Sequence, residues 1–159
     1  MSTDRKEILK QKMSGARTAL TNLLSQLTSE QWQTPVFSEQ QTWTVQYIVA
    51  HLTDAEQGMS IQVHKIRKGQ ETLPEGFDLN QWNAGVQERV GTLTVAELLD
   101  RMPKVRARTL QVLDSINEDE WELQGRHPSR GLITIEQYYE TIAGHDMTHT
   151  GDIKRALGL

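Results

Sequence analysis

Residues 134–156 read TIEQYYETIAGHDMTHTGDIKRA, and no other stretch says more about the fold. It opens with a capping box, Thr134-Ile-Glu-Gln137, whose side-chain oxygens can each satisfy a free backbone N–H at a helix start. Behind the box, one face carries a residue every three or four positions: Ile135, Tyr138, Ile142, His145, His149, Asp152 and Ala156. This period predicts a helix whose inward face contains polar residues that need an explanation.

Three further segments carry the same periodic apolar pattern and predict helices over about 3–27, 44–68 and 94–116. A stretch rich in Gly, Pro and charge, residues 69–78, separates the second from the third, and a short helical segment over 79–90 follows it. A connection of this length is unlike a tight helical hairpin. We therefore expect an all-α fold, a four-helix bundle with a long crossover that contains a short helix.

The ends of two predicted helices resemble each other. The helix over 3–27 leads into Leu27-Thr-Ser-Glu-Gln-Trp32, and the helix over 94–116 leads into Ile116-Asn-Glu-Asp-Glu-Trp121. Each helix is expected to finish in a short turn anchored by a tryptophan. Two similar ends alone do not establish a repeat, but they fit two helix pairs related by rough symmetry.

Length, charge and composition narrow the protein class. The 159 residues fit one domain, 1–159, large enough to bury a core. The absence of cysteine excludes disulfides, thiolate metal sites and a cysteine nucleophile. The net charge of −4, with Lys and Arg dispersed among acids, indicates no nucleic-acid partner. The N-terminus lacks a secretory pattern and no apolar run is membrane-length, so we expect no membrane partner and a cytoplasmic location.

His145 and His149 lie four residues apart and so share one helix face. Such pairs also occur on solvated faces, but this one falls on the seam that should be buried. Two interpretations remain: both rings are hydrogen-bonded core histidines, or both bind a metal ion. His51, just off the apolar stripe of its own helix, is a third candidate ligand. Three imidazoles with an open position suit zinc, nickel or another late first-row ion.

The residues around these histidines resemble the DinB superfamily, also called DinB/YfiT-like metalloenzymes. The resemblance rests on Trp43-Thr-Val-Gln-Tyr-Ile-Val-Ala-His51-Leu-Thr-Asp-Ala-Glu56, on His145-Asp-Met-Thr-His149-Thr-Gly-Asp-Ile153 and on Phe77-Asp-Leu-Asn-Gln-Trp-Asn83. It implies an up-down-down-up four-helix bundle, a metal bound by His51, His145 and His149, and a homodimer as a common state. Relatives with assigned activities mostly use mycothiol or bacillithiol, whose thiol the metal is thought to activate.

The resemblance leaves three acidic residues to be assigned. Members of the family commonly carry glutamine where this chain has Asp152, and a carboxylate there could orient an imidazole, approach the metal or accept a proton. Glu56 is read either as a base or hydrogen-bond acceptor for the site or as a solvated helix residue. Asp146 points away from the histidine face and is read as a surface residue or an interhelix partner.

Other residues have weaker claims on the site. Trp82 and Asn83 could close its open side, or the tryptophan could simply plug the end of the bundle. His127, beside Arg126 and Arg130, is read as a solvated loop residue or as part of a small basic patch for an anionic substrate.

Three functions follow as alternatives. The first is a metal-dependent enzyme that activates a low-molecular-weight thiol such as bacillithiol or mycothiol for S-transfer to a small electrophile. The second is a metal-dependent hydrolase, and the third a non-catalytic metal-binding or ligand-binding bundle. In the enzymatic readings the substrate is a small molecule, and Asp152 and Glu56 are the candidate catalytic residues beside the ion.

Overall fold

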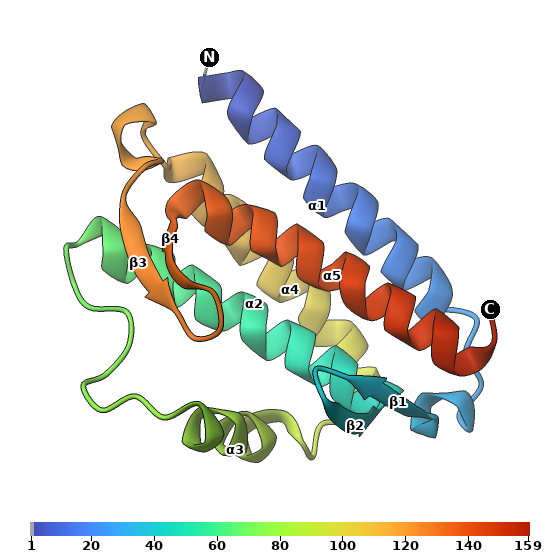
Figure 1. Cartoon of the computed structure of the whole chain (residues 1–159). Helices are drawn as coiled ribbons and strands as arrows, with labels where there is room; N and C mark the ends of the chain where they lie inside the picture. Colours follow the sequence, from blue (N-terminus) through green and yellow to red (C-terminus); the bar gives the residue numbers. More distant parts are fainter. Residues whose placement is uncertain (1) are drawn as a thin grey trace.

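Four long helices form the body of the computed structural model, which describes residues 2–159 (Figure 1). They are α1 (Ser2–Leu24), α2 (Val45–Arg67), α4 (Val95–Ser115) and α5 (Ile135–Leu157). The crossover after α2 contains the short helix α3 (Leu79–Val90) and returns the chain to the opposite end of the bundle. As a result α2 and α4 run in one direction and α1 and α5 in the other, which confirms the up-down-down-up bundle.

The expected helix starts are present. Thr134 caps α5 by accepting a hydrogen bond from the backbone N–H of Gln137 (3.2 Å), whose carboxamide oxygen accepts from the Thr134 N–H (2.8 Å). At α4 the Thr94 hydroxyl accepts from the Glu97 N–H (3.1 Å). Thr44 caps α2 in the same way. Within residues 2–159, no helix is both long enough and apolar enough to cross a membrane.

The all-α fold class is confirmed, but the sequence analysis did not predict two short antiparallel hairpins. Strands β1 (Pro35–Ser38) and β2 (Gln41–Thr44) precede α2, and β3 (Gln124–His127) and β4 (Gly131–Thr134) precede α5. Each strand has only four residues, too few for an alternating pattern to stand out from the sequence. The first hairpin pairs Ser38 with Gln41, so Glu39 and Gln40 form its tip.

The resemblance between two helix ends reflects a repeated structural unit. After α1 come a 3-10 turn (η1, Gln31–Gln33), hairpin β1–β2 and α2; after α4 come a 3-10 turn (η2, Glu118–Glu120), hairpin β3–β4 and α5. Trp32 lies within its 3-10 turn and Trp121 directly follows the other, and both are buried, as expected. Both following helices start at a threonine cap. The bundle is therefore two copies of one helix–turn–hairpin–helix unit joined through the crossover.

The bundle core is divided into two apolar clusters. One contains Leu20, Ile48, Leu52, Leu98 and Ile153, and the other contains Met13, Val63, Leu113, Tyr138 and Ile142. Each long helix contributes polar or charged residues, buried or nearly so, between these clusters: Arg17, Glu56, Arg106, Thr109, Asp146 and His149. A polar layer thus crosses the bundle at mid-height.

Four charged residues of this layer form one buried ionic cluster. The Glu56 carboxylate accepts hydrogen bonds from Arg17 (3.0 Å), from two Arg106 nitrogens (3.0 Å each) and from the Thr109 hydroxyl (2.6 Å). Asp146 accepts from both arginines at 3.0 Å. Two positive and two negative side chains from α1, α2, α4 and α5 therefore balance one another.

These contacts correct two expectations. Glu56 is only 3% exposed, so the solvated reading was wrong, and for Asp146, which is 2% exposed, the interhelix reading is confirmed over the surface one. Burial alone would raise the pKa of Glu56, but hydrogen bonds from Arg106 and Thr109 and the arginine charges lower it. The Glu56 carboxylate is accordingly ionised and engaged by α1 and α4.

Candidate metal centre

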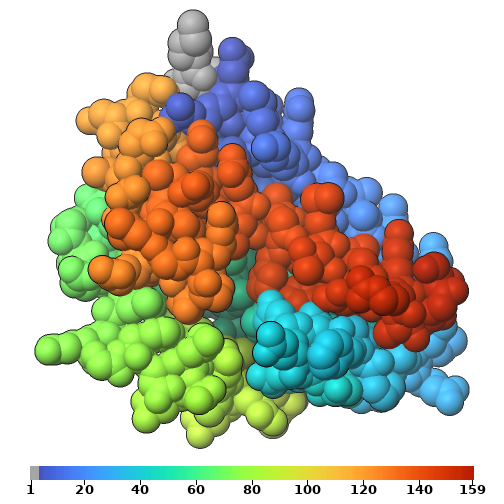
Figure 2. Space-filling view, viewed as in Figure 1, coloured from blue at the N-terminus to red at the C-terminus, as the bar shows by residue number. Residues whose placement is uncertain are grey.

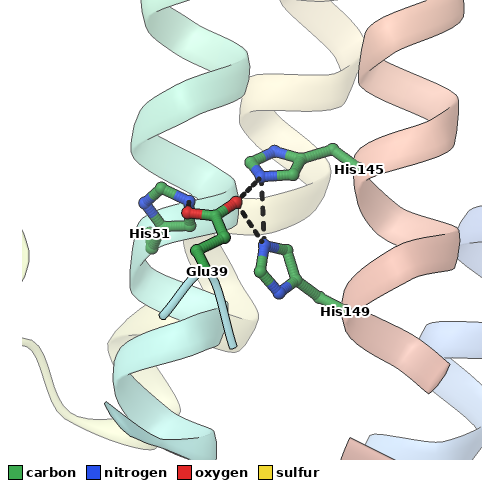
Figure 3. A group of neighbouring side chains, drawn as sticks. All are labelled: Glu39, His51, His145 and His149. Atoms are coloured by element: carbon green, nitrogen blue, oxygen red, sulfur yellow. Dashed lines mark hydrogen bonds and ion pairs between the residues drawn. The ribbon is translucent and has the colours of Figure 1, made fainter. Parts of the chain in front are cut away.

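Four side chains from three elements converge beside the polar layer (Figure 3). His51 comes from α2, His145 and His149 from successive turns of α5, and Glu39 from the tip of hairpin β1–β2. One nitrogen or oxygen of each residue lies within 4.8 Å of the corresponding atom of every other. The structure thus brings together the three histidines singled out from the sequence and adds a carboxylate.

The separations between these atoms are short. His145 Nε2 lies 3.0 Å from His149 Nε2, and Glu39 Oε1 lies 3.3 Å from the first and 3.4 Å from the second. Glu39 Oε2 lies 3.7 Å from His51 Nε2. Two atoms that bind one ion at about 2.1 Å are about 3.0 Å apart at a right angle and about 3.4 Å apart at the tetrahedral angle. The separations among His145, His149 and Glu39 match these values, and His51 offers a ligand atom within 4.8 Å of all three.

The His149 ring is oriented by contacts to its Nδ1, the nitrogen that does not face the other converging side chains. It is fully buried, and its Nδ1 lies 3.1 Å from Ser38 Oγ, which donates to Asp152 Oδ2 at 2.6 Å. Because the serine proton is directed at Asp152, its oxygen is free to accept from Nδ1–H of His149. With a metal ion at this point, the neutral ring would carry its lone pair on Nε2; without one, Nε2 can instead donate to Glu39. Among the roles considered for Asp152, the geometry favours orienting an imidazole.

The Nε2 atom of His51 faces the other converging side chains and lacks a hydrogen-bond partner. This nitrogen is also buried. Burial, together with the neighbouring His145, lowers the pKa of His51 to about 4, so the ring is neutral at pH 7. A buried imidazole nitrogen without a partner is costly in a core. A metal ion satisfies it, so the residues present fit the group that the sequence led us to expect.

Glu39 was not predicted as a site residue. It and Gln40 are the two central residues of the hairpin turn and have φ values of 51° and 64°. Turns of this kind favour Asn-Gly because both positions need positive φ, and other residues there are strained. The strained pair places the carboxylate against the histidines. Hydrogen bonding with His145 and then His149 holds the pKa of Glu39 well below its usual value.

The remaining candidates lie elsewhere. Glu56 makes its contacts within the ionic cluster and is not one of the four converging residues, so its predicted role as a base receives no support. Trp82 packs against Phe77 with ring centres 5.8 Å apart. His127 forms part of hairpin β3–β4, not a free loop, and its Nδ1 accepts from the backbone N–H groups of Ser129 and Arg130. Burial lowers the pKa of His127 to about 4.

Two cavities differ in their relation to the histidines. A cavity of about 810 Å³ lies along the crossover, lined by Lys65, Phe77 and Arg126 among others, and contains none of the four converging residues. A smaller one of about 200 Å³ includes His51 in its wall, together with Asn83. In Figure 2 the surface is hollowed between the crossover, the β1–β2 hairpin and α5, with α2 visible at the floor. The expectation that Asn83 borders the site agrees with this placement.

Solved structures of the same fold include proteins with assigned activities. YfiT from Bacillus subtilis, described as a probable metal-dependent hydrolase with an unusual four-helix bundle topology, is 21% identical; the match covers 99% of this chain and 90% of that one, with a TM-score of 0.72. A mycothiol-dependent maleylpyruvate isomerase is 15% identical, and the match covers 96% of this chain but 60% of the isomerase, with a TM-score of 0.74. No curated protein sequence matches.

A third structure involves DNA. The colibactin self-resistance protein ClbS, determined in complex with double-stranded DNA, is 17% identical; the match covers 97% of this chain and 96% of ClbS, with a TM-score of 0.71. Identities this low show a shared fold and leave ligands unassigned. For this chain, the absence of a nucleic-acid partner therefore remains a prediction from charge.

The sequence itself supplies the family. The model of the DinB superfamily matches residues 6–153, a range that contains all four long helices almost completely and every residue of the converging group. The chain is a member of the DinB superfamily.

Proposed function

We propose that this protein is a metal-dependent enzyme in which a divalent ion, zinc or nickel, is held by His51, His145 and His149. The observation that carries the proposal is the convergence of three Nε2 atoms, one of them buried without a partner, on a single point beside a carboxylate. An ion bound there would supply Lewis-acid activation of a small nucleophile. His149 is held in the required tautomer by Ser38 and Asp152.

Glu39 is the proton acceptor in this proposal. Its carboxylate lies on an exposed hairpin tip, 3.3–3.7 Å from the Nε2 atoms of the three histidines. Its side chain is 47% exposed, whereas that of His149 is fully buried, so Glu39 can swing away while the histidines stay fixed. Glu39 Oε1 would accept the proton of the incoming nucleophile and return it to the leaving group.

Two nucleophiles are compatible with this arrangement. A low-molecular-weight thiol such as bacillithiol or mycothiol makes the protein an S-transferase acting on a small electrophile. Because the chain has no cysteine, that thiol has to come from a cofactor. Water makes the protein a hydrolase, and Glu39, a carboxylate beside the ligands, specifically favours this second form.

Metal content tests the common part of the proposal. Protein prepared without a histidine tag is incubated with zinc or nickel, desalted and analysed for metal, in the wild type, in His149→Ala and in His64→Ala, a matched variant at an exposed histidine. We expect about one ion per chain in the wild type and in His64→Ala, and a loss of it in His149→Ala. A wild-type protein without stoichiometric metal would refute the proposal.

Turnover separates the two forms from a non-catalytic bundle. Metal-loaded protein is offered monochlorobimane or chlorodinitrobenzene with a panel of thiols, and a nitrophenyl ester without thiol. Metal-dependent thiol consumption supports the transferase and metal-dependent ester cleavage the hydrolase. In either assay Glu39→Gln should lower kcat by about 10²–10⁴-fold while metal stays bound. Metal binding without turnover in any assay would leave the protein a metal-binding bundle.

A further inference from the structure

The two hairpins make equivalent contacts in the two structural units. In the first unit, the tip of β1–β2 meets α2 where Glu39 approaches His51. In the second unit, the tip of β3–β4 meets α5, where the Arg130 guanidinium donates a hydrogen bond to the Thr141 hydroxyl. Counted from the helix starts at 45 and 135, both contacts fall at the same position, six residues on. Arg130 is therefore the counterpart of Glu39 in the second unit.

Arg130 lies beside the metal centre. Its partner Thr141 precedes His145 by four residues, so these two side chains share one side of α5, about 6 Å apart along the helix axis. Burial, together with the neighbouring Arg130 and His145, lowers the pKa of His127 in the same hairpin, so its ring is neutral at pH 7. In Figure 2 the segment that contains β3–β4 borders the hollow on the side away from β1–β2. The tip of β3–β4 thus forms part of the rim of the metal centre.

Hairpin β3–β4 is held firmly against the bundle. The backbone carbonyl of Arg126 accepts hydrogen bonds from the Thr72 hydroxyl (2.7 Å) and from the Tyr138 hydroxyl (3.1 Å). At the tip, His127 Nδ1 accepts from the backbone N–H of Arg130 at 3.2 Å. Since the hydroxyl of α5 also holds its guanidinium, Arg130 is fixed at both ends of its side chain.

The charge of Arg130 is not compensated. Its guanidinium donates to a neutral hydroxyl, and within residues 2–159 it forms no ion pair. The acidic residues nearest on α5 do not neutralise it, because Glu136 is paired with Arg5 at 2.8 Å and Glu140 lies beyond ion-pair distance. A divalent ion at the converging group would face the single negative charge of Glu39. With the ion in place, the metal centre and Arg130 together carry a surplus of positive charge.

We infer that Arg130 is the specificity-determining residue of the metal centre and that the substrate carries a carboxylate about 6 Å from the group that meets the ion. A planar guanidinium pairs with a carboxylate through two parallel N–H···O bonds, and Thr141 uses only one of the five N–H groups of Arg130. One guanidinium matches the single charge of a carboxylate better than the two charges of a phosphate monoester. The inference rests on the proposed function, since the ion holds the other end of the substrate, and it applies to both nucleophiles.

Two hydroxamates that differ only at one end test the inference. The hydroxamate group binds zinc, and butyrohydroxamate ends in a methyl group where succinate monohydroxamate ends in a carboxylate. Affinities for zinc-loaded protein are measured by isothermal titration calorimetry at pH 7 and fixed ionic strength. The variants are Arg130→Gln and, as matched control, Arg126→Gln. The control removes the same charge from the same hairpin, but from a side chain that lines the 810 Å³ cavity along the crossover. Zinc content is determined on every sample.

The quantity compared is the ratio of the two affinities, to which the attraction between the ion and the carboxylate contributes equally in all three proteins. We expect Arg130→Gln to lower the preference for the carboxylate about fivefold, the range of a charge-assisted hydrogen bond at an exposed position, and Arg126→Gln to leave it unchanged. An unchanged preference in Arg130→Gln would overturn the inference, and so would an equal loss in Arg126→Gln, the sign of a general effect of net charge. Zinc-loaded wild type that does not prefer succinate monohydroxamate overturns it too and leaves the metal site standing. Failure to bind zinc refutes the proposed function instead.

Discussion

Replacing Glu56 with glutamine is expected to weaken the fold severely without emptying the metal site. In the wild type, Oε1 of Glu56 accepts from Arg17 and Arg106, and Oε2 accepts from Arg106 and Thr109. Glutamine has only one acceptor oxygen. Whichever way the amide is turned, its NH2 group faces two donors, at least one of them a guanidinium, and the cluster keeps two positive charges against Asp146 alone.

The size of the effect follows from these contacts. Two hydrogen bonds that involve charged groups are lost, each worth about 1.5–3 kcal/mol, and removing one partner of a buried ion pair costs about 3–5 kcal/mol. The Glu56 side chain is 3% exposed, so solvent cannot take over the role of the lost acceptor. We expect a decrease of about 3–5 kcal/mol in the free energy of unfolding, a large part of the stability of an ordinary domain.

Urea unfolding of the zinc-free protein measures this loss, with Asp100→Asn as control. Asp100 pairs with Lys104 on the exposed face of α4, a contact worth about 0.3–0.5 kcal/mol. Adding Arg17→Gln to Glu56→Gln removes the surplus positive charge and should restore part of the stability. A loss below about 1 kcal/mol in Glu56→Gln would refute the electrostatic argument. If the Glu56→Gln variant folds but no longer binds zinc, Glu56 contributes to the metal site after all.

Three further predictions concern the site and its support. Gln40→Gly should raise the free energy of unfolding by about 0.5–1 kcal/mol, because glycine adopts positive φ without strain; a lower urea midpoint would contradict this. Ser38→Ala should weaken zinc binding about 10–100-fold in a competition with a chelating dye, whereas Ser29→Ala, at an exposed position, should not. Because the folded protein holds the pKa of His51 near 4 and the unfolded chain near 6.5, the unfolded state binds more protons between these values. As the pH falls from 6.5 to 4, this group should therefore lower the free energy of unfolding of the zinc-free protein by up to about 3 kcal/mol. Urea unfolding at a series of pH values measures the loss. If His51→Gln leaves this pH dependence unchanged, the loss does not come from His51.

The features that could be predicted from the sequence are those set by the positions of residues along a single helix. His145 and His149 stand out because a four-residue spacing places both rings on a seam that is apolar apart from Asp152. The helix lengths, the helix caps and the crossover were predicted in the same way, from the apolar periodicity, the capping residues and the stretch rich in Gly and Pro. His51 lies on another helix, so the residues alone made it only a candidate, and the family resemblance joined it to the pair.

The features that escaped prediction depend on contacts between distant segments. Glu39 lies 106 positions from its partner His145, in a turn without the glycine that identifies tight hairpins. For Glu56, both the catalytic and the solvated reading missed the ionic cluster, because nothing near Glu56 in the sequence indicates its contact with Arg106, 50 positions away. Only the assembly of the whole bundle brings the arginines of α1 and α4 to a buried carboxylate of α2.

The ionic cluster also fixes how far each helix is inserted along the bundle axis. A helix that slid past its neighbours by one turn would move each side chain by about 5.4 Å. For α5, such a slip would take Asp146 away from arginine nitrogens that now lie 3.0 Å from it and would carry its charge toward an apolar cluster. The aligned register is the one in which all four charges pair. In the same register His145 and His149 lie at the height of His51 along the bundle axis. The ionic cluster, which contains none of the proposed metal ligands, therefore keeps the three histidines aligned.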